Sequence, residues 1–273
     1  MRYSLNTPPA GETDVKQAMP DPNFEHRLHD LKVRVAPLER LVNAFAGSLS
    51  SPIIYHSGQE HYGYRYGKPD VRHFCLLKSV RAVSAINAMV ALARGGFAQE
   101  IRVLVRTLVE CTTQIEFVID ALDQNDMLAP DVDKYIKDFF ADFARNSSAD
   151  FKRAQVKQGI VHQRLGATLD KISQQAGDVG QRVPAELRYS NIYLTYSNYV
   201  HGKYPEIMVL YGGVPGQFHL DGMRGTSEDE ENLLTIDSFI DTAALALKLM
   251  VSRLRLHSIL EAEPTLGIWF RSS

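Results

Sequence analysis

The chain has 273 residues, of which 45% are hydrophobic and 23% charged, and its formal net charge at pH 7 is −2. This composition is typical of a globular protein with enough apolar residues for a sizeable core. The near-neutral charge excludes a global attraction to nucleic acid or to an anionic membrane, so a local patch would have to recognise such a partner.

Apolar periodicity and helix breakers predict a mostly helical chain. In chain order, the predicted helices span residues 23–46, 71–93, 97–121, 132–145, 148–175, 185–201 and 227 to about 260. Gly95 and Gly96 separate the second and third of these by a tight turn, which is typical of a helical hairpin. Pro37 predicts a kink or a break in the first helix. Ser227 and Glu230 match a capping box at the start of the last one.

The remaining segments are predicted to be non-helical. Residues 1–22 are rich in proline with little apolar content and are expected to form a flexible lead-in. A loop is predicted over 47–70, a short β-hairpin over 206–222 and a loose tail over 263–273. The sequence therefore predicts an all-α fold: a single multi-helix bundle over residues 23–262, with a central helical hairpin and one short β-hairpin insertion.

Cysteine usage and hydropathy indicate the cellular compartment. Cys75 and Cys111 lie in helical patterns without a CxxC motif, which fits a reducing cytoplasm and argues against a disulfide framework. The N-terminus lacks the apolar core of a signal peptide, and no run of about 18 uninterrupted apolar residues occurs. We therefore expect a cytoplasmic protein without a membrane partner.

Two polar segments interrupt otherwise apolar helical patterns: RTLVE, which includes Arg106 and Glu110, and SNYVHG, which ends the 185–201 helix. The 97–121 helix is apolar nearly all round, so it is expected to be central, and Arg102 and Arg106 are expected to meet partners from another helix. Arg106 and Glu110 are four residues apart and therefore neighbours on one face. Burying such groups costs several kcal/mol unless they are paired. They form either a structural lock or a chemical site.

The second polar segment contains the candidate histidine, His201, with Asn198 beside it. His201 lies just before Gly202, where its side chain either caps the helix end or acts as a general acid–base whose charged form Glu110 would favour. Tyr193 and Tyr196 either pack between helices or line a pocket on which bases stack.

A second candidate surface is the sequence HYGYRYGK, residues 61–68. Tyr64, Arg65 and Lys68 supply aromatic and basic side chains that could hold single-stranded RNA, or the loop simply packs on the bundle. The chain has no GxGxxG, P-loop, HExxH or GxSxG motif. No metal and no cofactor are therefore expected.

The order of a glycine-turn hairpin, RTLVE and SNYVHG resembles a widespread group of bacterial proteins classed only as a domain of unknown function, over about residues 70–260. More distantly the chain resembles the HEPN superfamily, in which many members are metal-independent ribonucleases of toxin and phage-defence systems. That resemblance implies that His201 helps a 2′-hydroxyl attack its phosphate while Arg102 or Arg106 stabilises the transition state. The chain departs from the HEPN pattern of an arginine four to six positions before the histidine, because the nearest upstream arginine is Arg188, thirteen positions away.

Two hypotheses therefore stand. The protein is an RNA-binding protein or ribonuclease that uses the Arg–Glu–His cluster as its site. Alternatively it is a non-catalytic helical scaffold or interaction protein, a homo-oligomer or a subunit bound to a partner protein, in which the cluster is a buried structural lock.

Overall fold

The computed structural model describes residues 22–57, 61–122, 127–140, 194–212 and 217–262, and all structural statements refer to these. Their helices are α1 (Phe24–Gly47), α2 (Val71–Gly95), α3 (Ala98–Asp120), α4 (Pro130–Phe140), a helical stretch over 194–200, α7 (Tyr204–Met208), α8 (Glu228–Arg253) and α9 (His257–Ala262). The predicted all-α class is confirmed. Most of the predicted lead-in, the tail, the 148–175 helix and the first part of the 185–201 helix lie outside the described residues.

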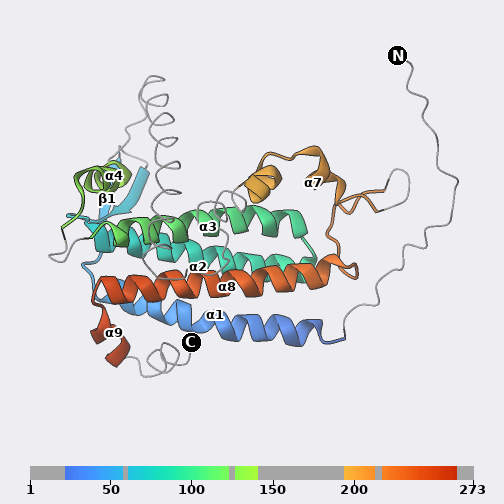
Figure 1. Cartoon of the computed structure of the whole chain (residues 1–273), viewed down its shortest axis with the longest axis horizontal. Coiled ribbons are helices and arrows are strands. Elements are labelled where there is room, and N and C mark those ends of the chain that lie inside the picture. The colour runs from blue at the N-terminus through green and yellow to red at the C-terminus, as the bar shows by residue number, and fades with distance from the viewer. Residues whose placement is uncertain (1–21, 58–60, 123–126, 141–193, 213–216, 263–273) are drawn as a thin grey trace, which may run out of the picture.

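Four long helices, α1, α2, α3 and α8, lie side by side and form the core (Figure 1). The core side chains are aliphatic and aromatic residues of all four helices, including Leu38, Phe45, Ile86, Met89, Ile101, Leu108, Ile115 and Leu247. Each large side chain of this kind stabilises the fold by about 1.5–3 kcal/mol when it leaves water. Because α3 contacts both α2 and α8, it buries residues around most of its circumference, as its apolar sequence predicted.

The first helix is continuous through Pro37, so the predicted break does not occur. A proline inside a helix leaves the carbonyl four residues earlier without its helical partner. That residue is Val33, whose side chain is 57% exposed. Val33 therefore lies on the solvent-facing side of α1, where water can reach a carbonyl that the proline leaves without a partner.

The α2–α3 hairpin forms at the predicted glycines, and a distant loop closes over its turn. Gly96 has a φ of 74°, which a residue with a side chain adopts only with strain. The backbone N–H of Met223 donates to the carbonyl of Gly96 at 2.9 Å. A methyl group added at Gly222 would lie 1.9 Å from the carbonyl oxygen of Gly95. The loop before α8 therefore packs against the turn by backbone contact, for which only glycine leaves room.

The two-stranded sheet forms outside the predicted hairpin segment, which keeps only one antiparallel bridge among the described residues. Strands β1 (Ile53–Ser57) and β2 (His61–Arg65) pair antiparallel within the segment predicted to be a loop. Their β-branched and aromatic residues suit a pleated surface. The segment 206–222 instead contains most of α7, with Pro205 in its first turn, and one isolated bridge between Tyr211 and Phe218. Proline fixes the backbone for a helix start, which explains the difference.

The start of α8 also corrects a prediction, because Ser227 makes no side-chain capping bond. The hydroxyl of Thr226 accepts from the N–H of Glu228 at 3.2 Å, and the Asp229 carboxylate accepts from the N–H of Gly225 at 2.7 Å. At its other end the predicted helix is interrupted by Arg255, whose φ is 55°. The helix therefore ends at Arg253, and α9 follows as a separate turn.

By length and composition one described helix, α2, could cross a membrane, and half of its apolar window is buried inside the protein. A core helix of a soluble protein meets the same criterion, so this finding is weak evidence for a span.

Candidate functional site

Arg102 is the centre of the polar cluster. It lies in the second turn of α3 and is only 5% exposed. Its Nη2 atom lies 2.6 Å from Oε2 of Glu228 and 3.1 Å from Oε1 of Glu231, both in the first turn of α8. Its guanidinium carbon lies 5.3 Å from the ring centroid of Tyr199, a residue of the 194–200 helix. We call these four residues the arginine lock, because one side chain joins three separate helices.

The electrostatics of the lock keep Arg102 charged. Burial alone lowers the pKa of Arg102, but the hydrogen bond and the charge of Glu228 outweigh this and raise it above its ordinary value. Burial raises the pKa of Tyr199, an effect that the neighbouring Arg102 opposes. The charge of this buried cation is already balanced by two carboxylates and an aromatic face, so the arrangement does not favour binding of a further anion.

Arg106 and Glu110 form the predicted ion pair one turn further along α3. Nη1 of Arg106 lies 2.8 Å from Oε2 of Glu110, and Nη2 lies 3.4 Å from Oε1. The Arg106 side chain is 11% exposed and that of Glu110 is 33% exposed. The spacing of four residues on one helix suffices to form this pair.

His201 does not share this interior. The 194–200 helix ends in a Schellman arrangement: the N–H of Lys203 donates to the carbonyl of Asn198 at 3.0 Å, and the N–H of Gly202 donates to that of Tyr199 at 3.2 Å. Gly202, with a φ of 56°, therefore ends the helix as predicted. His201 is exposed, whereas Arg102 and Arg106 are buried. The prediction of one interior holding all these groups is wrong for His201, because the glycine turn leaves it at the helix end in solvent.

The predicted substrate-binding residues fall into separate places. Tyr196 is half-buried and packs edge-on against Phe239 of α8, with ring centroids 5.7 Å apart. Tyr64 is 67% exposed on β2, and Lys68 after it is also exposed. Arg65 is half-buried at the end of β2, and Tyr193 lies outside the described residues. Figure 1 shows β1 and α7 near opposite ends of the bundle, so the two groups of candidates do not form one site.

Sequence reasoning did not identify Glu228 and Glu231 as partners of Arg102. Glu228 and Glu231 are three residues apart on one helix face, so both can contact the same cation. The surrounding sequence does not indicate that this cation is Arg102. The described residues contain no group of three or more His, Cys, Asp or Glu that could hold a metal ion. A hollow of about 190 Å³ between α1 and α8 has Arg27, Arg34 and Asp237 in its lining and includes no predicted site residue.

Comparison with known proteins places the chain in a family. Residues 73–213, slightly more than half of the chain, match the model of the family of unknown function DUF5677, and the chain belongs to this family. The match includes α2, α3, α7 and His201 and ends before α8, which supplies the two glutamates of the lock. No characterised protein and no solved structure matches the chain significantly.

Proposed function

We propose that this member of DUF5677 is a helical interaction protein that associates with a second copy of itself, with the arginine lock holding the interacting elements in place. The observation that carries the proposal is the pairing of the buried Arg102 with the largely buried Glu228 and with Glu231, whose side chain is 62% exposed. A phosphate that approached Arg102 would have to displace two carboxylates, so the cluster suits structure better than anion binding.

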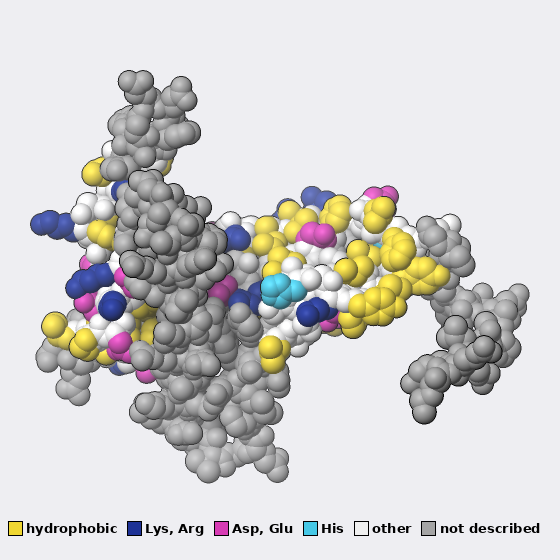
Figure 2. All heavy atoms as spheres, turned by 90° about the horizontal axis from the view of Figure 1, so that it is seen from above, with side chains coloured by type: hydrophobic (Ala, Val, Ile, Leu, Met, Phe, Trp, Pro, Cys, Tyr) yellow, Lys and Arg dark blue, Asp and Glu magenta, His cyan; other side chains and the backbone are white. Residues whose placement is uncertain are grey.

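The 194–200 helix, which the lock holds against α3 and α8, and the chain that follows it through α7 carry exposed apolar side chains. Hydrophobic side chains gather on the face that carries α7 (Figure 2). Six large ones, each between 45% and 82% exposed, define the apolar face: Leu194, Val200, Tyr204, Ile207, Phe218 and Leu220. Soluble monomers rarely expose contiguous apolar patches larger than a few hundred Å², and such patches usually mark an interface.

The size of the apolar face supports a dimer. Aromatic side chains present about 150–250 Å² each and aliphatic ones less, so two aromatic and four aliphatic residues at these exposures provide several hundred Å². A stable interface buries about 800 Å² on each partner, of which the apolar centre is a part. A twofold axis would place this face against itself, and the net charge of −2 gives little repulsion between copies.

Sedimentation analysis of the whole chain tests this proposal over roughly 1–100 μM, a range that brackets micromolar affinity. The wild-type protein is expected to be a dimer, and Leu220→Glu or Tyr204→Glu is expected to make it monomeric, since each puts two like charges across the axis. Leu245→Glu is the matched control, because Leu245 is 59% exposed on α8 outside the apolar face. A monomeric wild type, or a dimer that neither face variant weakens, would refute the proposal.

A second candidate is the RNA-cleaving, HEPN-like activity that the sequence resemblance implies. It is favoured by the exposure of His201 two residues after Tyr199, whose ring lies over Arg102. Within the described residues, Nη1 of Arg102 is buried without a hydrogen-bond partner, so its two N–H groups remain unpaired. In this reading His201 is the base and Arg102 the cationic group. Asn198, Arg106 and Glu110 would support them, and Tyr64, Arg65 and Lys68 would form a separate contact with the RNA near the other end of the bundle.

Induced expression in bacteria, followed by incubation of the purified protein with RNA, tests the second candidate. Since His201 is exposed, His201→Ala should keep the fold, so a loss of toxicity and of cleavage would report on chemistry. His257→Ala is the control, because His257 is an equally exposed histidine at the start of α9. An intact wild-type chain that is neither toxic nor able to cleave RNA would reject this activity.

A further inference from the structure

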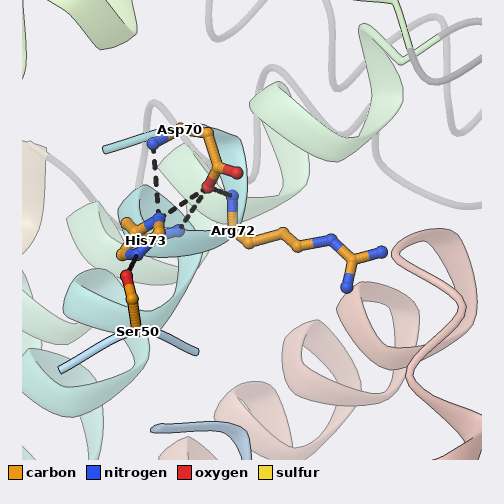
Figure 3. Close-up of polar contacts among 4 residues, drawn as sticks. All are labelled: Ser50, Asp70, Arg72 and His73. Carbon is orange, nitrogen blue, oxygen red and sulfur yellow. Dashed lines mark hydrogen bonds and ion pairs between the residues drawn. The ribbon is translucent and has the colours of Figure 1, made fainter. Parts of the chain in front are cut away.

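A second polar constellation, separate from the arginine lock, surrounds His73 at the start of α2 (Figure 3). His73 is 5% exposed. Its Nδ1 lies 2.7 Å from Oδ1 of Asp70, and its Nε2 lies 3.4 Å from the hydroxyl of Ser50. The ring of Tyr66 packs against the imidazole, with centroids 4.4 Å apart. One imidazole therefore has a carboxylate on one nitrogen and a serine hydroxyl on the other.

The contacts of Asp70 decide which nitrogen of His73 carries the proton. Oδ1 of Asp70 also accepts the backbone N–H groups of Arg72 at 2.9 Å and of His73 at 3.1 Å. Burial raises the pKa of Asp70, but the hydrogen bonds from His73 and Arg72 outweigh it, so the pKa is lowered and the group stays a carboxylate. A carboxylate 2.7 Å away accepts a proton from Nδ1, which leaves Nε2 as the acceptor facing Ser50.

Helix capping explains only part of this arrangement. In a reciprocal capping box, Nδ1 of His73 would accept the backbone N–H of Asp70, which lies 3.4 Å away. Nδ1 cannot donate to the carboxylate and accept from this N–H at once, and the shorter bond to the charged acceptor is the stronger. The cap requires only the carboxylate of Asp70. It does not account for the hydroxyl on the opposite side of the ring.

We propose that Ser50 is a nucleophilic serine that accepts an acyl group from small activated esters, with His73 as its base and Asp70 positioning the imidazole. Ser50 is exposed, whereas His73 is buried, so a substrate can reach the hydroxyl while the base stays fixed. A nucleophile, a base within hydrogen-bond reach and a group that orients the base are the features of activated serines, and this contact is often long before substrate binds.

The reaction balances with these groups and the ester alone. Oγ of Ser50 attacks the carbonyl carbon and forms the new C–O bond as its proton passes to Nε2 of His73. The bond to the leaving alcohol then breaks, and Nε2 returns the proton to the leaving oxygen. Water can later attack the acyl-serine by the same route in reverse, with His73 taking its proton, which releases the acid and restores the hydroxyl.

This site is independent of the proposed function. His73 lies near the start of α2, and the hairpin turn near Arg102 lies at its end. At a rise of 1.5 Å per residue, the two are about 30 Å apart along the helix. Loss of dimerisation would leave the reactivity of Ser50 unchanged, and a failed labelling experiment would leave the dimer unaffected.

The test is labelling of the full chain with a fluorophosphonate probe, mapping of the modified residue by mass spectrometry, and turnover of p-nitrophenyl acetate. Ser50 is expected to carry the label, and Ser50→Ala to abolish labelling and turnover. Ser48→Ala is the matched control, because the Ser48 hydroxyl donates to the carbonyl of Phe45 at 2.7 Å and is expected to stay unlabelled.

A second variant, at Asp70, tests whether His73 acts as the base, without replacing a buried side chain. Asn caps helices as well as Asp does, so Asp70→Asn should preserve α2. An amide does not stabilise the imidazolium, and labelling is expected to slow by at least about tenfold. An unlabelled Ser50 in the folded wild type, or labelling at equal rates in wild type and Asp70→Asn, would overturn the proposal.

Discussion

Replacing Arg102 by alanine tests how much of the fold's stability depends on the arginine lock. Arg102 and Glu228 have side chains that are 6% and 15% exposed, so removing the arginine leaves a buried carboxylate without its cation. Breaking a buried pair in this way costs about 3–5 kcal/mol. Since domains are stable by about 5–15 kcal/mol, the variant would lose a large share of the total.

The assay is urea unfolding followed by far-ultraviolet circular dichroism, with Arg27→Ala as the matched control. Arg27 pairs with Glu230, in the same first turn of α8, but these side chains are 34% and 54% exposed. An exposed pair contributes about 0–1 kcal/mol, so the control should unfold close to the wild type. Removing both buried charges, by Arg102→Met with Glu228→Gln, should recover most of the loss, because the remaining carboxylate of the lock, Glu231, is 62% exposed and stays hydrated. A cost of less than about 1 kcal/mol for Arg102→Ala, equal to the control, would refute the assignment of the lock.

Two further predictions concern single positions in the bundle. Burial raises the pKa of Glu116 from 4.5 to about 7. Because this folded-state pKa lies above the unfolded one, stability should fall as pH rises between these values, by up to about 3 kcal/mol. Urea unfolding at several pH values measures this fall, which Glu116→Gln should remove. Glu100→Gln, at an exposed position of α3, should retain it. If Glu116→Gln had the same pH profile as the wild type, the raised pKa of Glu116 would be contradicted. Gly222→Ala should cost on the order of 2 kcal/mol more than Gly225→Ala. Both glycines have positive φ, but only the methyl at Gly222 meets the backbone, so equal thermal stabilities would argue against the close contact at the hairpin turn.

The sequence predicted the parts of the site that depend on contacts within one helix. Arg106 and Glu110 pair because a spacing of four places them on one face. Gly96 and Gly202 end their helices because each adopts a positive φ with little strain. Both features follow from local backbone geometry, which adjacent residues encode.

The errors arose where a short pattern had two local solutions. The segments 53–65 and 206–222 both contain aromatic and β-branched residues beside glycine; the first forms two paired strands, whereas the described part of the second has a short helix and one antiparallel bridge. Single-segment patterns of this kind do not distinguish strand from helix when tertiary contacts determine the outcome.

The sequence by itself determined that the chain is a helical bundle, that α2 and α3 form a hairpin, and that the charges of α3 must find partners. Only the tertiary structure decided which partners. Glu228 lies 126 positions from Arg102, and Ser50 lies 23 positions from His73. The position of each helix against its neighbours is set by the packing of the whole core, to which every buried side chain contributes. No local stretch of sequence contains that information, so the contacts between elements appear only when the bundle is assembled.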